Sequence, residues 1–467
     1  MKTMRKDLTI KSIFWVLTGL VLAICSYFII HNASWLLGDD CQTLIYTGWD
    51  KPIFGFFVSP TVGRFFPLDY TIYDLLLPFF DGQIPPAAHY AVHIVCFLLF
   101  IGSFIWLSLY ILRKESAVWR YSITFSLVIL VIGRTFLNYA QCWTGIWTIF
   151  TFLPVFIICS LRFLDTAKWR YGIIALLVIN YVLYYYETMF VIPLSIGVLA
   201  FVFSVKQMSK QAKIYYASLI VSGLLFLLLY AILVLPKVEN FYAHHSEFSL
   251  LQNAWRMFVA QKIMWLVVVF LIIRLFHLIK KETSFCFYDN LLLASSAYCV
   301  GAAILGLNYT LYYTPGVLIA IPAVLAFCIQ YFRKEWTLAL FIALALFYGR
   351  KIPKDIKSSQ NERVSTYTNV QAFIEQINDK QVFFFEPTVE TMENWEWEIR
   401  HIRRFYLEKV TGWYMQDQDF HIETRTEFLG EPGLWQVTKG DIPLFVEIWP
   451  DAKCVVDFGN SKVFLIE

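Results

Sequence analysis

Two adjacent carboxylates, Asp39 and Asp40, are the first residues of this chain whose type and position could do chemistry. They lie in the segment WLLGDDCQ, a few residues after a long apolar stretch, in a chain with only 16% charged residues. One carboxylate of such a pair can accept a proton while the other orients it or holds a cation, because their mutual repulsion separates their pKa values. Two solvated acids in a loop would give the same pattern, so the surrounding residues decide between the two interpretations.

Cationic side chains are expected on the same side of the membrane as this acidic pair. Arginine suits an anionic ligand, since its planar guanidinium grips two oxygens at once and stays charged beside a low-dielectric wall. The cations considered are Arg64, Arg134, Arg256 and Lys262. For Arg64, pairing with a nearby carboxylate is an equally good interpretation. The carboxylates considered for that pairing are Asp39, Asp69 and Asp74.

Other polar residues could line a cavity on that side. Glu187 follows LYYY at the end of an apolar stretch, and a carboxylate at a membrane boundary is a functional candidate by default. A structural partner such as Arg134 or Lys262 would explain it equally well. His89 and His93 have metal-ligand spacing, but HYAVH lacks the glutamate of the HExxH motif, so no metal is indicated. The candidate cavity residues are Glu187, His244, His245 and Asp69.

The composition identifies the kind of protein that must position these residues. Of 467 residues, 58% are hydrophobic and 18% are aromatic, which is more apolar surface than a soluble fold can cover. The chain is therefore expected to be an all-α polytopic membrane protein. The net charge of +3 gives no reason to expect a nucleic-acid partner.

Apolar stretches long enough to cross a bilayer, which takes ~20 residues, predict eleven spans in this chain. Basic residues in the short connections number eighteen on the side of the N-terminus and six on the other side before the tail, so the N-terminus is predicted to be cytoplasmic. An odd number of spans then places the C-terminal domain outside, on the face of Asp39 and Asp40. The spans are predicted near 12–31, 89–112, 118–136, 146–161, 171–186, 188–205, 214–235, 263–279, 291–307, 315–332 and 336–349.

The chain divides into two predicted domains. Residues 1–349 form the membrane body, with a long first outer loop at 32–88, and residues 350–467 form a water-facing domain that holds twenty of the 35 acidic residues. Within the loop, PTVGRFFPLDYTIYDLLLPFF is too interrupted by proline to span the membrane and too apolar to be solvated. It therefore predicts helices that lie in the membrane interface.

The C-terminal domain is expected to be a small α+β module. Its helices are predicted near 368–379 and 392–409, and its strands in QVFFFE, LFVEIW, CVVDF and VFLI. It has no GxGxxG, GxSxG or P-loop pattern, so acceptor handling or shielding of the site is its expected role.

These features, in this order, resemble a known superfamily. A first span that ends in GDD, a long outer loop with the segment GRFFP, many short-looped aromatic spans and an outer C-terminal domain are similar to the GT-C superfamily of membrane glycosyltransferases. Its members include protein O-mannosyltransferases, lipid A aminoarabinose transferases and bacterial O-antigen glucosyltransferases. The resemblance covers the body at 1–349 and is strongest from Leu36 to Pro67.

The resemblance implies an enzyme that moves a sugar from a polyprenyl-phosphate carrier to an acceptor hydroxyl on a cell-envelope glycan, a lipid or a protein. The reaction would occur at the outer face of a bacterial cytoplasmic (inner) membrane. Asp39 falls on the family's general-base position, and Asp40 on its second acidic position, where relatives often have glutamate. The candidate residues for binding the donor phosphate, and for stabilising it as it departs, are Arg64, Arg134, Arg256 and Lys262. No cofactor is implied, and a divalent metal, although two carboxylates could hold one, is not indicated.

Two other functions are compatible with parts of the sequence. An O-antigen-type polysaccharide polymerase or ligase also binds lipid-linked sugars with outer arginines, but usually places its largest outer loop late in the chain. A secondary transporter predicts repeated halves and spans broken at matching positions, which the sequence does not show. Convergence of Asp39, Asp40 and Arg64 on one outer pocket would favour sugar transfer over transport.

Overall fold

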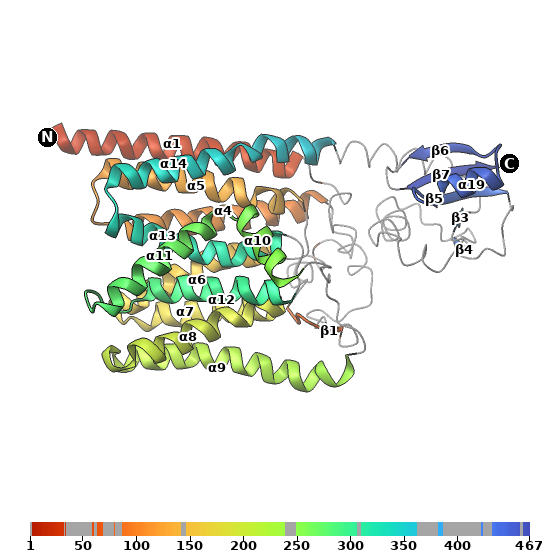
Figure 1. Ribbon diagram of the computed structural model, residues 1–467. Coiled ribbons are helices and arrows are strands. Elements are labelled where there is room, and N and C mark those ends of the chain that lie inside the picture. The colour runs from red at the N-terminus through yellow and green to blue at the C-terminus, as the bar shows by residue number, and fades with distance from the viewer. Residues whose placement is uncertain are drawn as a thin grey trace.

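The computed structural model contains a bundle of long helices and, near the C-terminus of the chain, a small sheet with one helix (Figure 1). The structure describes residues 2–31, 33, 58–59, 63–68, 79, 86–141, 146–238, 249–305, 310–361, 382–385, 422–423, 432–457 and 461–467. The helices of the bundle lie within residues 2–361, and the sheet lies within residues 382–467.

Short connections and 3-10 helices join the long helices of the bundle. The α-helices are α1 (Lys2–His31), α4 (Pro86–Ile111), α5 (Ala117–Ala140), α6 (Ile146–Thr166), α7 (Trp169–Tyr185), α8 (Val191–Ser204), α9 (Lys210–Leu233), α10 (Leu250–Ala260), α11 (Ile263–Ile279), α12 (Phe287–Ile304), α13 (Thr314–Tyr331) and α14 (Lys334–Gly349). The 3-10 helices are η3 (Glu187–Phe190), η4 (Val205–Gln207), η5 (Leu235–Lys237) and η6 (Thr310–Tyr313). Every predicted span coincides with one of the α-helices.

The lengths and hydropathies of these helices confirm the polytopic membrane fold. Among the described residues, eight helices are long and apolar enough to cross a membrane, and the pair α10 and α11, bent by 105°, makes a ninth. α7 is also apolar, but with 17 residues it is shorter than those eight helices. The sequence predicts a short last span, but helical residues continue from α14 to Asn361, so this span is 28 residues long and passes through the predicted domain boundary at 349.

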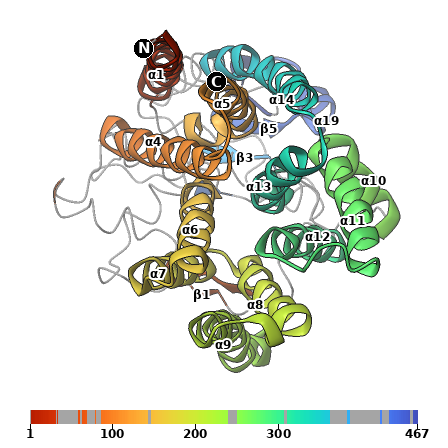
Figure 2. The ribbon, with the colours of Figure 1, turned by 90° about the vertical axis from the view of Figure 1, so that its left-hand side faces the viewer.

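Burial separates the inner helices from the outer ones. In the most apolar stretches of α5, α6 and α13, 78%, 83% and 83% of the residues are buried, against 22% in α1, α9 and α14. An apolar helix that is buried on all sides lies in the core, whereas an apolar helix with an exposed face meets lipid. Viewed along the bundle, α13 lies inside the ring of helices (Figure 2), where it packs against α6, α11 and α12.

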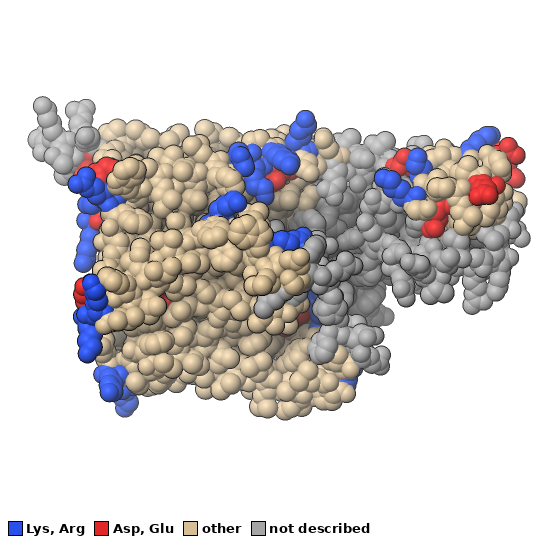
Figure 3. Space-filling model, in the orientation of Figure 1, with Lys and Arg blue, Asp and Glu red and all other residues tan. Residues whose placement is uncertain are grey.

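Basic side chains mark the end of the bundle at which the chain begins. α1 begins at one end, here called the N-terminal end, which also holds the α4–α5 connection with Arg113 and Lys114. α1 finishes at the other end, here called the distal end, at His31. Lys and Arg side chains line the N-terminal end, at the left of Figure 3. This is the end that the distribution of basic residues assigns to the cytoplasm.

The segment GRFFPL differs from its prediction. β1 (Val58–Ser59) pairs antiparallel with β2 (Arg64–Phe65), and Ser59 lies opposite Arg64. Gly63 precedes β2 with a φ of 73°, a left-handed conformation that glycine adopts readily and that an α-helix does not contain. The predicted interfacial helix is therefore wrong for residues 63–68, and nearly all the rest of that stretch lies outside the described residues.

The C-terminal module contains a five-stranded mixed sheet with strand order β4-β3-β5-β7-β6. β3 runs parallel to both of its neighbours, whereas β7 runs antiparallel to β5 and β6. A small core of Phe385, Trp435, Val437, Phe445 and Phe464 covers one face. The strands are β3 (Val382–Phe384), β4 (Ile422–Glu423), β5 (Gly433–Thr438), β6 (Lys453–Asp457) and β7 (Ser461–Ile466).

One strand predicted in this module is a helix. LFVEIW lies mostly in α19 (Ile442–Ile448), which has Asp441 at its N-cap and a proline in its first turn, where the fixed φ of proline suits a helix. In this helix, Phe445 is buried against the sheet, whereas the neighbouring Leu444 and Val446 are exposed. β3, β6 and β7 coincide with the other predicted strands, whereas β5 was not predicted. The helices predicted near 368–379 and 392–409 lie outside the described residues.

Candidate functional site

An ion pair between Arg64 and Glu187 lies at the distal end of the bundle. The Nε atom of Arg64 is 2.6 Å from Oε1 of Glu187, and only 18% and 19% of the two side chains are exposed. The guanidinium also lies 4.5 Å from the centre of the Phe66 ring and 5.7 Å from that of Tyr186. The pair therefore places two opposite charges in a mostly aromatic environment at a membrane boundary.

The GRFFPL segment is fixed to α7 and α9 by its backbone and by Phe65. The Tyr230 hydroxyl donates a hydrogen bond to the carbonyl of Gly63 at 2.8 Å, and the amide of Leu68 donates to the carbonyl of Tyr184 at 3.0 Å. Phe65 is buried in a small cluster with Leu183, Phe226 and Val234. These contacts on both sides of Arg64 hold its backbone in place, so the position of the guanidinium is set by the scaffold.

Glu187 opens η3, directly after the end of α7. The backbone of Tyr186 is extended and separates α7 from η3. This break turns the Glu187 side chain toward Arg64. The prediction that Arg134 or Lys262 would be the partner of Glu187 is therefore wrong, because Glu187 pairs with Arg64, which the β1–β2 turn brings close to it. The other carboxylate oxygen, Oε2, is buried and has no hydrogen-bond partner within the described residues.

Arg134 is a second cation near the distal end, on the inner helix α5. Its Nη2 donates a hydrogen bond to Oγ1 of Thr314 at 3.2 Å, and its guanidinium lies 5.9 Å from the centre of the Tyr348 ring. Its Nε is buried and has no hydrogen-bond partner in the described part of the chain. The neighbouring Gly133 explains the tight packing here, since a Cβ at that position would lie 2.4 Å from the Tyr348 carbonyl oxygen.

Arg256 and Lys262 approach the same region from the bent pair of helices. Arg256 lies on an exposed face of α10 near the buried Tyr313. Lys262 occupies the 105° bend between α10 and α11, and its backbone amide lies near the Tyr348 hydroxyl, beside Arg134. The bend therefore brings two cations from the α10–α11 region to the ends of α13 and α14.

The beginning of α13 connects the two groups of cations, and sequence reasoning missed it. Tyr312 stacks on Tyr186, the residue before Glu187, with ring centres 6.3 Å apart, and Tyr313 lies near Arg256. Thr314 accepts the hydrogen bond from Arg134. The run YYTP, with consecutive aromatics before a helix-starting proline, was a signal that could have marked this segment.

The two histidines of HYAVH are packed inside the bundle. His89 and His93 are both fully buried, with ring centres 4.3 Å apart, and Nδ1 of His93 hydrogen-bonds with the carbonyl of Tyr139 at 3.0 Å. The His93 ring also lies 4.1 Å from the ring centre of Trp147. Within the residues that the structure describes, no group of three or more His, Cys, Asp or Glu side chains could hold a metal.

Several predicted site residues lie outside the described residues. These are the catalytic candidates Asp39 and Asp40 and the cavity candidates Asp69, His244 and His245. Asp39 and Asp40 belong to the stretch between α1, which ends at the distal end, and β1, whose partner strand carries Arg64. The roles of all five remain predictions.

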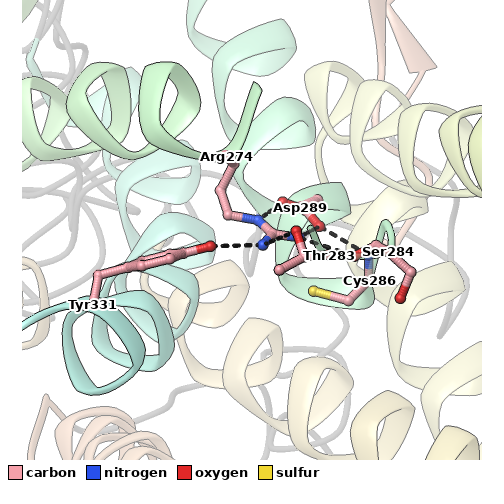
Figure 4. Close-up of polar contacts among 6 residues, drawn as sticks. All are labelled: Arg274, Thr283, Ser284, Cys286, Asp289 and Tyr331. Carbon is pink, nitrogen blue, oxygen red and sulfur yellow. Dashed lines mark hydrogen bonds and ion pairs between the residues drawn. The ribbon is translucent and has the colours of Figure 1, made fainter. Parts of the chain in front are cut away.

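A third buried arginine, Arg274 on α11, belongs to a different kind of site (Figure 4). Its Nε and Nη2 donate to the two oxygens of Asp289, both at 2.7 Å, and its Nη1 donates to Thr283 and Tyr331. Asp289 also accepts from the amide of Cys286 at 2.8 Å. This saturated cluster ties α11, α12 and α13 together at the N-terminal end of the bundle.

The distal end thus holds several charged side chains that could bind a ligand. Arg64, Arg134, Arg256 and Lys262 are cations that could bind an anion, and Glu187 offers a carboxylate oxygen without a hydrogen-bond partner in the described part. Aromatic rings lie near Arg64 and Arg134, and a low-dielectric surrounding strengthens the interaction of a charge with a charged ligand. The site could therefore stabilise a phosphate and orient a polar molecule beside it.

The chain was compared with known proteins. No protein-family model and no curated protein sequence matches it. Two solved structures of ArnT from Cupriavidus metallidurans do match, each with 12% sequence identity. The form bound to undecaprenyl phosphate has a TM-score of 0.55, and the match covers 96% of this chain and 97% of that chain. The apo form has a TM-score of 0.56, and the match covers 97% of this chain and 98% of that chain. The chain therefore has the fold of ArnT along nearly its whole length, which confirms the expected GT-C-like architecture.

Proposed function

We propose that this protein is a membrane glycosyltransferase that takes a sugar from a polyprenyl-phosphate carrier and transfers it to an acceptor hydroxyl. The observation that carries the proposal is the convergence of Arg64, Glu187 and Arg134 at the distal end of an ArnT fold. One of the two ArnT structures holds undecaprenyl phosphate, a carrier of the proposed class. The likeness favours sugar transfer over the transporter and polymerase alternatives, because neither of those predicts this fold.

Arg64 and Arg134 are the proposed ligands of the donor phosphate. Glu187 engages the Nε of Arg64 and so orients the guanidinium, whose fork of N–H donors suits two phosphate oxygens. Arg134 adds a second charge, and its buried Nε, which has no hydrogen-bond partner among the described residues, could donate to a phosphate oxygen. As the phosphate leaves the sugar it gains charge, so both contacts would strengthen in the transition state. Arg256 and Lys262 would raise the local positive potential.

Asp39 is the proposed general base. It would take the proton of the acceptor hydroxyl while that oxygen bonds to the anomeric carbon of the sugar. The bond between the anomeric carbon and the phosphate oxygen breaks, and the electron pair leaves with the polyprenyl phosphate. Asp40 would orient Asp39 or hold a neighbouring cation. The Oε2 of Glu187, which has no hydrogen-bond partner among the described residues, would accept a hydrogen bond from a hydroxyl of the donor or the acceptor.

The proposed setting is the cytoplasmic (inner) membrane of a bacterium, with the N-terminal end of the bundle in the cytoplasm. The excess of Lys and Arg in the connections at that end supports this orientation. The distal site and the C-terminal module, residues 350–467 by the predicted division, would then lie outside. The acceptor would be a glycan, a lipid or a protein of the cell envelope, and the module would handle or shield it.

Binding of the carrier can be tested with the purified full-length protein. Native mass spectrometry would compare undecaprenyl phosphate with undecaprenol, which has the same tail and no phosphate. We expect the phosphate to be retained about tenfold better, and Arg64→Ala to remove most of that advantage, because a hydrogen bond to a charged group contributes ~1.5–3 kcal/mol. Lys237→Ala, a change at an exposed lysine of η5, is the matched control and should leave the ratio unchanged.

Transfer itself can be tested in cells. Sugar and lipid analysis of the envelope, with and without the gene, should show one glycan, lipid or protein that loses a sugar when the protein is absent. Equal binding of undecaprenol and undecaprenyl phosphate, together with an unchanged envelope, would contradict the proposed function.

A further inference from the structure

A groove of about 530 Å³ runs along the surface of the bundle between α1, α5 and α14. α1 and α14 both pack on α5, and the three helices lie side by side in Figures 1 and 2. α5 forms the floor with residues such as Phe125, α1 forms one wall with Ile13 and Leu17, and α14 forms the other with Ile342 and Leu346. The lining is almost entirely apolar, so the occupant of the groove must be apolar as well.

The position of the groove matches one leaflet of the membrane. On α1 its lining extends from Ile10 to Leu17, which is a length of about 10 Å at 1.5 Å per residue. It starts close to the N-terminal end, near the beginnings of α5 and α14, and stops well short of the ~30 Å thickness of a hydrocarbon core. Several wall residues face outward, since Ile13 is 53% and Leu346 69% exposed. An acyl chain entering from the N-terminal end would fit this geometry.

Two cations, Arg120 and Lys11, lie next to residues that line the groove. The Tyr121 ring lies in the lining, 5.1 Å from the Phe14 ring of α1, and the Arg120 guanidinium lies 5.1 Å from the centre of the same Tyr121 ring. The Nε of Arg120 is buried and has no hydrogen-bond partner within the described residues. Lys11 directly follows the lining residue Ile10 and is exposed.

Two other basic residues at this end form ion pairs with acids. Lys334 pairs with Glu115, and Arg113 pairs with Asp165 at 3.1 Å. In the described part of the chain, no such pair exists for Arg120 or Lys11. These two residues therefore add positive charge next to residues that line the apolar groove, which is the pattern expected for a ligand with an anionic head and a hydrocarbon tail.

We propose that this groove binds an anionic glycerophospholipid of the leaflet at the N-terminal end. One acyl chain lies between α1 and α14, and the phosphate is held by Arg120 and Lys11. A two-chain lipid of one leaflet suits a groove that stops within the membrane, whereas the polyprenyl carrier is assigned to the distal end. The site is independent of the proposed sugar transfer, so either proposal can fail without the other.

Lipid retention by the full-length protein tests the proposal. Detergent-purified protein is mixed with phosphatidylglycerol or phosphatidylcholine of identical acyl chains, and the bound lipid is counted by native mass spectrometry. We expect phosphatidylglycerol to be retained about fivefold better, the equivalent of about 1 kcal/mol for a basic residue beside an anionic head group. Arg120→Gln should bring the ratio close to one, while Lys114→Gln, a change at an exposed lysine of the same end, should leave it unchanged.

A second variant tests the apolar part of the site. Ile342→Trp should fill the groove and lower the retention of both lipids, and its melting temperature in detergent shows whether the fold is intact. Equal retention of the two lipids by the unaltered protein would overturn the assignment of the head group. Unchanged retention in both Arg120→Gln and Ile342→Trp would overturn the site. Displacement of phosphatidylglycerol by undecaprenyl phosphate, lost in Ile342→Trp, would replace the proposed occupant with the carrier.

Discussion

Arg274 and Arg134, which lie at opposite ends of the bundle, differ in how completely their hydrogen bonds are satisfied. At the N-terminal end, Arg274 binds Asp289 with two nitrogens and donates to Thr283, Tyr331 and the Ser284 carbonyl as well. At the distal end, Arg134 donates to Thr314, and its Nε has no hydrogen-bond partner among the described residues. Glu187, beside Arg64, likewise has one carboxylate oxygen, Oε2, without a hydrogen-bond partner in the same part of the chain.

This difference separates a structural charge from one prepared for a ligand. A buried ion pair is compatible with a stable fold when every donor and acceptor has a partner, as in the Arg274 cluster (Figure 4). A buried group without a partner costs free energy, so the Nε of Arg134 and the Oε2 of Glu187 would gain from hydrogen bonds to a ligand. Substitutions at Arg134 and Glu187 are therefore expected to act on ligand binding and rate, and substitutions at Arg274 on stability.

Asp39→Asn should have the largest effect and should act on the rate alone. The change removes the proposed base and keeps the shape of the side chain, so transfer should fall by ~10² to 10⁴, while the melting temperature stays unchanged. Asp40→Asn, the matched change at the neighbouring carboxylate, should cost less. A larger loss of transfer rate in Asp40→Asn would mean that the two roles are exchanged. A transfer rate in Asp39→Asn within a few-fold of that of the unaltered protein would show that Asp39 is not the general base.

Arg274→Ala should destabilise the protein strongly, because it leaves Asp289 as a buried charge without its counter-ion. The expected loss is about 3–5 kcal/mol, which a fall in the melting temperature and in the yield of folded protein would reveal. The double variant Arg274→Met with Asp289→Asn removes both charges and should recover part of the loss. If Arg274→Ala instead lowered the binding of undecaprenyl phosphate with no change in melting temperature, the two ends would not differ as described.

Arg64→Lys separates a phosphate ligand from a structural partner. Lysine keeps the charge and loses the planar fork, so binding of undecaprenyl phosphate should weaken about tenfold if Arg64 grips two phosphate oxygens. Glu187→Gln is the matched variant, since it keeps the phosphate ligand and removes only the ion pair. Near-native binding by Arg64→Lys, together with a severe defect in Glu187→Gln, would show that the pair acts only as a structural element.

Thr314→Val should give the smallest effect. It removes the hydrogen bond from Arg134 while keeping the shape of the side chain, and a hydrogen bond to a charged group contributes ~1.5 kcal/mol at the lower end of its range. Because Arg134 would lose its orientation, the affinity for undecaprenyl phosphate should fall roughly five- to tenfold, as measured by titration. A loss of melting temperature without a loss of affinity would assign Arg134 to the structural kind of site.

The membrane body was predictable because bilayer crossing leaves a long apolar run that needs no tertiary information. Each predicted span coincides with a helix, from α1 to α14. Shorter patterns failed where packing determined the outcome. LFVEIW has the apolar content of a strand, but the proline in its first turn and the burial of Phe445 against the sheet make it a helix. GRFFPL was predicted to lie in an interfacial helix, but Gly63 has a left-handed backbone conformation and the short strand β2 follows it.

The candidate site divides in the same way. The sequence identified Arg64, Glu187 and Arg134 as exceptional charges, because a charged residue at the edge of an apolar run is rare without a reason. It did not identify the partner of Glu187 or the contacts of the segment at the beginning of α13, since Tyr312 and Thr314 look like ordinary residues at the start of a span. Their importance depends on contacts with helices more than a hundred residues away along the chain.

The sequence by itself determined that this is a polytopic membrane protein and which types of residue are available for chemistry, since hydropathy and charge are properties of each side chain. Only the tertiary structure decided which charges meet. Glu187 faces Arg64 because a glycine turn and a break after α7 bring two distant segments together. Arg274 is saturated and Arg134 is not because hydrogen bonds depend on angstrom-scale distances, which helix packing sets and no local pattern records.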